Sequence, residues 1–362
     1  MEVTIIGEAR RVVVIGTGMV GTSVALALRE RGDEVRLADR DPFAVRLAVE
    51  LGAGEPLRDA DGDGPADIAV LAVPPAAVAA TLLDAQKRDL ARVYTDVASV
   101  KARPLREAAE LGCDLGSFVA GHPLAGSERS GPAAARGDLF LGRPWALCPT
   151  PETSQSAVAA AAALAEACGA QIAVLDAEEH DKAVALVSHG PHVAAAAVAA
   201  RLQSAPEAAL GLAGQGVRDV TRIADGDPEL WIGILSSNAA PVADVIDAVA
   251  ADLAATAAAL RAGLETAVTA LLERGGAGRD RLPGKHGDRG GAYAVVSVVI
   301  PDRPGELALL FQTAGVAGVN IEDVMIEHSP GRPVGVVELS VKPDAAQRLA
   351  DELRARGWSV PG

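Results

Sequence analysis

The stretch RVVVIGTGMVG, Arg11 to Gly21, determines the expected fold of the first third of the chain. A short β-branched run leads directly into a glycine-rich turn, which is followed by the helical stretch TSVALALRERG. This order of strand, turn and helix is the context in which a GxGxxG pattern binds a dinucleotide. Gly16 would permit the tight turn, Gly18 the approach of a pyrophosphate, and Gly21 close packing of helix on strand. The alternative is a glycine turn that only packs.

A carboxylate stands where a dinucleotide-binding fold needs one. A second strand, EVRLAD, ends at Asp39, 18 residues beyond Gly21, which is about where an acidic residue holds the ribose hydroxyls. Its negative charge would repel a 2′-phosphate. The sequence therefore favours NAD over NADP as the cofactor, although the neighbouring Arg40 weakens this preference slightly.

Strand-like and helical segments continue to alternate as far as residue 149. Expected strands lie in DIAVLAVPP, VYTDVASVK, SFVAGHPLAG and PWALCP, at residues 67–75, 93–101, 117–126 and 144–149. Such alternation is typical of an α/β fold with a doubly wound sheet, which binds ligands at the carboxyl ends of its strands. We therefore assign residues 1–149 to a Rossmann-type nucleotide-binding domain.

The next part of the chain has a helical pattern. From about residue 150 the alternation stops, and alanine-rich stretches follow. Between residues 236 and 274 apolar side chains recur at spacings of three, four or seven, which is typical of long helices with one buried stripe. Since a small domain cannot cover such a stripe alone, we expect residues 150–274 to form an all-α domain that makes a homodimer.

Composition narrows the class of protein. The 362 residues are 49% hydrophobic and carry a formal charge of −15, which favours a folded protein and argues against nucleic-acid binding. No uncharged apolar run approaches the roughly 20 residues of a membrane helix, and the start lacks the pattern of a secretory signal. We expect a soluble, cytoplasmic protein, not bound to a membrane, in which Cys113, Cys148 and Cys168 are buried thiols.

Histidines mark a candidate site. His122, in GHPLAGSE, is one of only six and follows an expected strand, which places it at the ligand-binding edge of the sheet unless it is only a loop or cap residue. The stretch SHGPH puts His189 and His192 around a Gly-Pro break. A zinc site prefers histidines four apart with an acid, so no metal is expected, and helix-end histidines bonded to carbonyls are the alternative.

Two arginines lie four residues apart in GVRDVTRIADGDPELW, residues 216–231. Arg218 and Arg222 share one helix face, and Asp219 is within reach of Arg222 for an ion pair. At a surface such a pair would be local and weak, whereas in a cleft a guanidinium binds a carboxylate through two parallel hydrogen bonds. The spacing alone leaves both interpretations open.

Six motifs occur in the order in which one enzyme family has them. They are GTGMVG, VLAVPP, TDVASVK, GHPLAGSE, HDKAVALVSHGPH and VRDVTRIADGDPELW, and they cover essentially residues 10–275. On these motifs the chain resembles bacterial prephenate dehydrogenases, NAD-dependent enzymes of tyrosine biosynthesis that oxidatively decarboxylate prephenate. Two positions depart from the family pattern: Leu124 replaces the usual Met or Ile, and Gly190 replaces the usual Leu of SHLPH, which would loosen that turn.

The resemblance implies a role for each matching residue. His122 would take the proton of the ring hydroxyl, Ser99 would support it, and Arg222 would bind the ring carboxylate; an imidazole that titrates near neutrality suits the first task. Further implied substrate contacts are His189, His192, Asp219, Trp231 and, near the pocket entrance, Glu128. Further implied cofactor contacts are Met19, Val20, Val73, Pro74 and Pro75.

The last part of the chain begins with an expected linker. Residues 275–291, GGAGRDRLPGKHGDRGG, are rich in glycine and charge, which is typical of a flexible connection. Residues 292–362 resemble an ACT domain, a βαββαβ module of ferredoxin-like α+β fold, with IPDRPGEL as its first turn and GVNIEDV before its second strand. The resemblance implies tyrosine or another aromatic amino acid as an effector, near Asp302, Pro304, Gly305 and Asn320.

We therefore expect a prephenate dehydrogenase, and the alternatives differ in testable ways. Arogenate differs from prephenate only far from the hydride, so an arogenate dehydrogenase has nearly the same motifs. A non-catalytic sensor of NAD and an amino acid would have no need for the set of His122, Ser99 and Arg222. A general β-hydroxyacid dehydrogenase usually has a helical lysine as its acid/base group, and no comparable motif holds one here.

Overall fold

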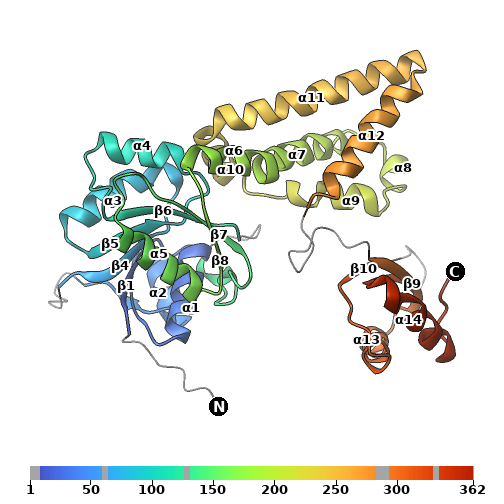
Figure 1. Ribbon diagram of the computed structural model, residues 1–362, viewed down its shortest axis with the longest axis horizontal. Coiled ribbons are helices and arrows are strands. Elements are labelled where there is room, and N and C mark those ends of the chain that lie inside the picture. Colours follow the sequence, from blue (N-terminus) through green and yellow to red (C-terminus); the bar gives the residue numbers. More distant parts are fainter. Residues whose placement is uncertain (1–8, 59–63, 126–130, 283–292, 329–333, 362) are drawn as a thin grey trace. The chain divides into compact units, whose positions relative to one another are not determined.

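The structure, a computed structural model, describes residues 9–58, 64–125, 131–282, 293–328 and 334–361. These residues form two compact units that meet along the chain between Val249 and Ala250. The first unit holds an α/β part followed by helices. The second holds the remainder of a long helix, a further helix and a small antiparallel sheet (Figure 1).

Within the described residues, one sheet of eight strands organises the first unit. The order across the sheet is β3-β2-β1-β4-β5-β6-β7-β8. Strands β1 to β6 run parallel, whereas β7 is antiparallel to β6 and parallel to β8. The strands are β1 (Arg11–Ile15), β2 (Glu34–Ala38), β3 (Glu55–Pro56), β4 (Ala66–Leu71), β5 (Ala91–Asp96), β6 (Phe118–Pro123), β7 (Pro144–Cys148) and β8 (Gln171–Val174).

Helices cover both faces of this sheet (Figure 1). Side chains of α1 (Met19–Glu30), α2 (Pro42–Glu50) and α5 (Gln155–Ala167) pack into one core, and those of α3 (Val78–Lys87) and α4 (Ala102–Glu110) pack into the other. Strand β1 supplies both cores, because its alternate residues point to opposite faces. The predicted doubly wound α/β fold is therefore confirmed, and the three cysteines are buried free thiols as expected.

The sheet extends further along the chain than the sequence indicated. The alternation was expected to stop near residue 149, but α5 packs on the sheet and β8 pairs with β7 as far as Val174. The alanine-rich sequence of α5 resembles that of the helices that follow, and a four-residue strand is too short to show a period. Both features hid the last strand from sequence analysis.

The helical part of the first unit begins with one continuous run. It consists of α6 (Ala177–Val184), a π-helical turn η3 (Ala185–His189) and α7 (Gly190–Leu202). The break that the Gly-Pro pair of SHGPH predicted does not occur. A π turn shifts the hydrogen bonds to i→i+5, and this wider turn accommodates Pro191, which has no N–H to donate.

This run is long and apolar enough to cross a membrane by length and composition, the one such helix in the described part of the chain. In the first unit this run is anchored next to the sheet. The Asp181 carboxylate accepts hydrogen bonds from the backbone N–H groups of Lys101 (2.8 Å) and Ala102 (3.0 Å) at the start of α4. The run is thus a helix of the folded unit that docks on the sheet edge.

The remaining helices as far as residue 279 are two short turns within the α/β part and the further helices that follow α7. Their bounds are η1 (Pro75–Ala77), η2 (Pro132–Ala134), α8 (Glu207–Leu210), α9 (Gln215–Thr221), η4 (Arg222–Ala224), α10 (Pro228–Ser237), α11 (Ala239–Ala262) and α12 (Glu265–Arg279). Helix α12 includes residues 275–279, which were expected to be linker. Each added residue of a helix gains a hydrogen bond, which here offsets the cost of about 1 kcal/mol per glycine.

The second unit contains a three-stranded antiparallel sheet with two helices. The elements are β9 (Ala294–Pro301), α13 (Glu306–Val316), β10 (Asp323–His328), β11 (Val334–Val341) and α14 (Pro343–Ala355), and the sheet order is β10-β11-β9. Ser359 forms a single antiparallel bridge to Val299 on the free side of β9. The order of elements, with its IPDRPGEL turn and the left-handed Gly305 before α13, is that of an α+β sandwich.

Gly190 is required by close packing. A Cβ atom at this position would lie 2.5 Å from Cγ1 of Val245 on α11 and 2.9 Å from the carbonyl oxygen of Ala185. Real Cβ atoms do not approach other atoms so closely. The departure from the usual leucine therefore brings α11 against α7 and does not loosen the turn.

We predict that Gly190→Ala lowers the free energy of unfolding by about 1–2 kcal/mol, because overpacking outweighs the better helix propensity of alanine. Urea unfolding measures this. The matched background is Val245→Ala, which removes the colliding methyl group. In that background Gly190→Ala should cost less, because only the contact with the Ala185 carbonyl oxygen remains, and equal destabilisation in both backgrounds would contradict the packing explanation.

Candidate active site

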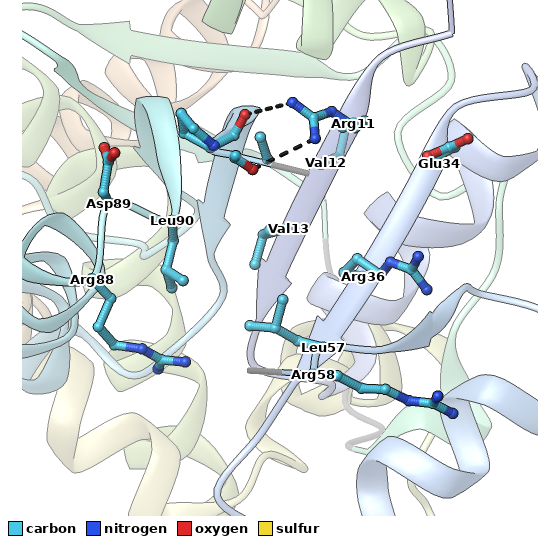
Figure 2. A pocket seen from close by; sticks show the side chains of 13 residues that line it. Arg11, Val12, Val13, Glu34, Arg36, Leu57, Arg58, Arg88, Asp89 and Leu90 are labelled. Carbon is cyan, nitrogen blue, oxygen red and sulfur yellow. Dashed lines mark hydrogen bonds between the residues drawn. The ribbon is translucent and has the colours of Figure 1, made fainter. Parts of the chain in front are cut away.

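One cavity lies at the amino ends of the strands of the large sheet, and another lies at their carboxyl ends. The first, of about 490 Å³, lies at the amino ends of β1, β2 and β4 and is lined by four arginines (Figure 2). There Arg11 donates hydrogen bonds to the carbonyl oxygens of Gly64 and Pro65, at 3.5 and 2.8 Å. The second, of about 790 Å³, opens at the carboxyl end of β6. Since open α/β sheets bind ligands at the carboxyl ends of their strands, the second cavity, here called the cleft, is the candidate site.

The cleft brings together residues that lie far apart in the sequence. His122 and Pro123 come from the end of β6, His192 from α7, and Trp231 from α10. Arg222 starts the short turn η4 and is exposed at the cleft. A guanidinium, two imidazoles and an indole therefore surround one space large enough for a small ring.

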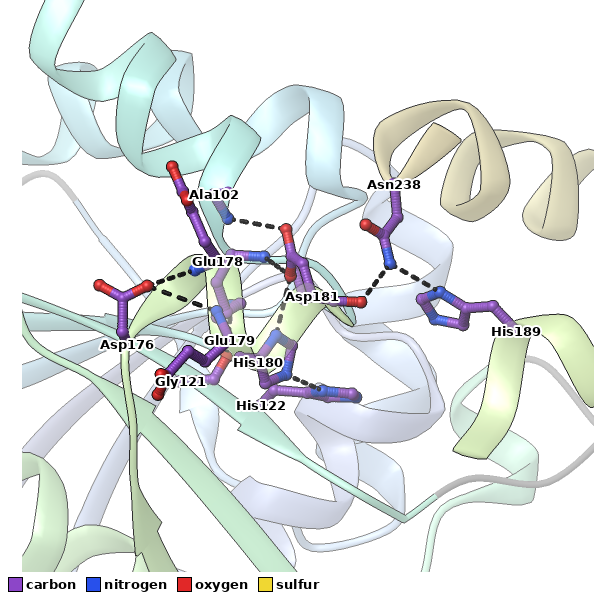
Figure 3. Close-up of polar contacts among 12 residues, drawn as sticks. Ala102, Gly121, His122, Asp176, Glu178, Glu179, His180, Asp181, His189 and Asn238 are labelled. Carbon is purple, nitrogen blue, oxygen red and sulfur yellow. Dashed lines mark hydrogen bonds and ion pairs between the residues drawn. The ribbon is translucent and has the colours of Figure 1, made fainter. Parts of the chain in front are cut away.

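A chain of hydrogen bonds leads away from His122 into the protein (Figure 3). Nδ1 of His122 lies 2.8 Å from Nε2 of His180 on α6, and Nδ1 of His180 lies 2.8 Å from Oδ1 of Asp181. His180 and Asp181 are 1% and 3% exposed, so this chain is shielded from water. The sequence indicated His122 but assigned no role to the two residues behind it.

The ionised Asp181 determines which ring nitrogens carry protons. Its carboxylate already accepts two backbone N–H bonds, and an ionised carboxylate can only accept, so His180 must donate from Nδ1. Nε2 of His180 is then an acceptor, and Nδ1 of His122 is the donor. This arrangement leaves Nε2 of His122 unprotonated, which is the state of a general base.

Burial and neighbouring charges keep the His122 ring neutral. Burial lowers the pKa of His122 well below its usual value, and His180, Lys101 and His189 lower it further. A neutral ring at physiological pH can accept a proton without first having to lose one. The site thus holds a ready base at the carboxyl end of β6.

A flat wall stands across the cleft from this base. The rings of His192 and Trp231 are stacked, with centroids 3.5 Å apart and planes within 10° of parallel. Gly226 permits the stack, because a Cβ atom there would lie 2.5 Å from Nε1 of Trp231 and 3.1 Å from Cε1 of His192. Burial lowers the pKa of His192, so this wall is uncharged at neutral pH.

Other residues expected at the site lie elsewhere or next to it. Ser99 is in the loop after β5, at the same sheet edge as His122. His189 is buried, and its Nδ1 lies 3.2 Å from Nδ2 of Asn238. Asp219 is exposed and accepts a hydrogen bond from Gln215 at 2.8 Å, in place of the expected pairing with Arg222. Glu128 lies outside the described residues.

The glycine loop has the geometry of a dinucleotide cradle. Gly16 has φ +105°, and a Cβ atom there would lie 2.1 Å from the carbonyl oxygen of Ala72. A Cβ atom on Gly21 would lie 2.0 Å from the carbonyl oxygen of Gly16, whereas one on Gly18 would meet nothing within 4 Å. Two glycines therefore serve packing, and the third leaves the approach to the start of α1 open, as a pyrophosphate needs.

Asp39 is held at this loop. Its Oδ2 accepts hydrogen bonds from the backbone N–H (2.6 Å) and hydroxyl (3.1 Å) of Thr17, and its Oδ1 accepts from the N–H of Asp41 at 2.9 Å. A carboxylate has about four lone-pair sites, so one acceptor position is left for a ribose hydroxyl. Val73, Pro74 and Pro75 follow β4 at the same edge. These residues fit an NAD molecule.

Comparison with known proteins gives two family matches. Residues 24–174 match the prephenate dehydrogenase nucleotide-binding domain, and residues 176–274 match the prephenate dehydrogenase dimerization domain. The boundary between the two matches falls directly after β8. Together they cover strands β2 to β8, the residues that line the cleft, and the helices from α6 to most of α12.

Individual relatives agree with these matches. The chain is 42% identical over 360 residues to "Probable prephenate dehydrogenase NovF" of Streptomyces niveus, which covers 96% of this chain and 99% of the relative. The crystal structure of prephenate dehydrogenase from Aquifex aeolicus in complex with hydroxyphenyl propionate and NAD⁺ is 27% identical, with a TM-score of 0.67 over 75% of this chain and 98% of that one. The crystal structure of Synechocystis arogenate dehydrogenase is 28% identical, with a TM-score of 0.64 over 75% of this chain and 99% of that one.

The buried His189 makes stability depend on pH. Asn238 donates to its Nδ1, and burial, the largest cause, lowers the pKa of His189 to about 4. Because the unfolded ring titrates near 6.5, the unfolded chain binds more protons between about pH 6.5 and 4. This part of the stability is complete above pH 6.5 and is lost as the pH falls towards 4.

We predict a slope from His189 of up to about 1.4 kcal/mol per pH unit in the free energy of unfolding across that window. Urea unfolding at several pH values measures it. His189→Gln keeps an acceptor for Asn238 but does not titrate, so its slope should be shallower than that of the wild type. Identical slopes would show that His189 is not the group responsible.

Proposed function

This chain belongs to the prephenate dehydrogenase family, and we propose that it converts prephenate to 4-hydroxyphenylpyruvate and carbon dioxide with NAD⁺ as oxidant, a step of tyrosine biosynthesis. One observation carries the proposal: His122, backed by His180 and Asp181, faces the same cleft as Arg222 and the stacked ring of Trp231. When bound, NAD⁺ supplies the hydride acceptor for the carbon that bears the substrate hydroxyl.

The base must remove the hydroxyl proton as the hydride leaves. His122 takes that proton on Nε2 while its Nδ1–H stays bonded to His180. The positive charge that forms on the ring is stabilised through His180 by the Asp181 carboxylate, as in a catalytic triad. Loss of carbon dioxide then restores the aromatic ring and makes the reaction strongly downhill.

Arg222 and the stacked wall orient the substrate. The guanidinium of Arg222 binds the ring carboxylate, the group that leaves as carbon dioxide, through a charge-assisted fork. The His192–Trp231 stack offers a flat apolar surface to the cyclohexadiene ring. Ser99, in the loop after β5, would support the hydroxyl, and His189 and Asp219 would act from outside the cleft lining.

The cofactor would lie along the carboxyl edge of the sheet. The pyrophosphate would pass over Gly18 to the first turn of α1 at Met19 and Val20, where the cap residue offers no side-chain hydrogen bond. The ribose would bind the remaining acceptor site of Asp39. The nicotinamide half would pass Val73, Pro74 and Pro75 towards His122.

Arogenate is the second candidate substrate. The likeness to Synechocystis arogenate dehydrogenase favours it, and so does Asp225, a carboxylate in the cleft lining that would suit the ammonium group of arogenate. Initial rates of NADH formation with each substrate at saturating NAD⁺ separate the two activities. Because the chain belongs to an enzyme family, we do not favour the alternative of a non-catalytic sensor of NAD and an amino acid.

The helical part would form a homodimer. Its match is to a dimerization domain, and large apolar side chains are exposed along α11 and the turn after it. Leu253, Leu260 and Leu264 are 62%, 65% and 56% exposed in the single chain. A second copy of the chain that packs on this stripe would cover these leucines. We further propose that the enzyme is cytoplasmic.

Residues 292–362, the last part of the second unit, would be an ACT domain that binds tyrosine as an effector. Its β-α-β-β-α order and the bridge at Ser359, which adds a short fourth strand position beside β9, support this assignment. The expected effector residues Asp302, Pro304 and Gly305 form the exposed turn before α13. Asn320 is exposed and donates to Glu322 at 2.8 Å.

We predict that Asp181→Asn lowers kcat by about 10³-fold, because the amide no longer fixes the proton on Nδ1 of His180 and the base is presented in the wrong tautomer. Stopped-flow or steady-state NADH formation measures this loss, and NAD⁺ affinity should stay close to that of the wild type. His122→Asn, which removes the base itself, gives the residual kcat with which Asp181→Asn is compared. Turnover at the wild-type rate in either variant would remove the assigned role.

Arg222→Gln should raise the KM for prephenate by about 10- to 100-fold, which corresponds to one charge-assisted contact. Arg218 is the matched control, since it lies one turn earlier, is exposed and is not among the residues that line the cleft. Arg218→Gln should leave KM near the wild-type value. If both substitutions raised KM equally, the loss of positive charge near the cleft, and not the loss of a direct contact with the substrate carboxylate, would explain the effect.

A further inference from the structure

A fully buried ion pair lies directly behind the base, and the proposed mechanism does not use it. Nζ of Lys101 pairs with Oδ2 of Asp96, and both side chains are 0% exposed. Two opposite charges without access to water are costly unless further hydrogen bonds satisfy them. The partners of these two groups therefore show what the pair holds in place.

Both charges bind the peptide groups of Gly121, the residue before His122. The Lys101 ammonium donates to the Gly121 carbonyl oxygen at 2.5 Å, and Oδ1 of Asp96 accepts from the Gly121 N–H at 3.0 Å. Gly121 has no room to move. A Cβ atom there would lie 2.7 Å from the backbone oxygen of Asp96 and 3.1 Å from Nε1 of Trp145.

Lys101 also touches the chain of hydrogen bonds behind His122. Its backbone N–H donates to Oδ1 of Asp181 at 2.8 Å, the same oxygen that lies 2.8 Å from His180. One residue thus contacts the strand that carries the base and the carboxylate that orients it. The lysine itself is not a proton donor for the substrate, because its ammonium is buried and already bonded to Asp96 and Gly121.

We propose that the Lys101–Asp96 pair is a positioning device for the base: its two charged groups hold the peptide groups on either side of Gly121, which sets where the His122 ring lies. This inference rests on the proposed role of His122. It gives Lys101 and Asp96 a function in the reaction although neither lines the cleft.

The charge effect has a definite sign. The ammonium of Lys101 opposes a second positive charge on His122, so removing it favours protonation of the ring. The activity that needs the unprotonated ring is then lost at a higher pH. The other titratable or charged groups around the ring are Asp96, the partner of Lys101, His180 and Asp181 on α6, His189 on η3, and His192, Arg222 and Asp225 at the cleft.

The test is the double variant Asp96→Asn/Lys101→Met, which removes both charges and leaves none buried without a partner. We expect a folded protein with NAD⁺ affinity near that of the wild type, and a kcat/KM at pH 7 lowered by about 10- to 100-fold, the size of effect that follows a small misplacement of a reacting group. The charge effect is measured in Lys101→Gln, which removes the ammonium alone: the acidic limb of its kcat/KM profile should move to higher pH. A ¹⁵N-imidazole titration of Lys101→Gln should show His122 protonating at higher pH than in the wild type.

A second, partly buried ion pair is the control. Asp33 is 5% exposed and bonds Arg10 at 2.6 Å, at the opposite edge of the sheet. Asp33→Asn should lower the melting temperature without moving the acidic limb. If the double variant does not fold, Lys101→Gln still tests the proposal, because the amide can donate to Asp96 and Gly121 while the positive charge is gone.

The outcomes separate the two proposals. A folded double variant with wild-type kcat/KM at pH 7, or an unchanged titration of His122 in Lys101→Gln, overturns the role of the pair. Wild-type protein that forms no NADH from prephenate or arogenate overturns the proposed function. The imidazole titration needs no turnover, so it still decides whether Lys101 controls the protonation of His122.

Discussion

The buried carboxylate of Asp181 is the contact on which the site depends. It lies on the first helix after the sheet, and its partners are two backbone N–H groups at the start of α4 and the ring of His180. A carboxylate without water is stable only when its oxygens are occupied, so these contacts fix α6 against the sheet edge. The position and tautomer of His180, and then of His122, follow from that single attachment.

Much of the fold could be predicted, because its periodic signals are strong. RVVVIGTGMVG gave the first strand, the turn and the helix, and the buried parallel strands appear as apolar runs that alternate with helical stretches. The last strand was not visible, since four residues show no period and the preceding helix is as rich in alanine as the helices that follow. The helical glycines at 275–278 were missed for a related reason, because local propensity is weaker than the continuation of an established helix.

The site was predicted where a motif places a residue at a strand end, and missed where tertiary contact alone brings residues together. His122 was found because it follows β6, whereas His180 and Asp181 are consecutive residues of a helix and do not face one direction. Their relation to His122 exists only after α6 docks. The helical spacing of Asp219 and Arg222 suggested a pair, but η4 begins at Arg222 and changes the direction of the side chains.

The continuous helical run from Ala177 to Leu202 has a consequence for how the cleft works. It carries His180 and Asp181 near one end and His192 of the stacked wall further along. Because one unbroken helix carries both groups, the spacing between the hydrogen-bonded histidine behind the base and the aromatic stack opposite is set by the rise of that helix. The width available to a substrate ring is thus a property of the backbone and does not depend on a flexible loop.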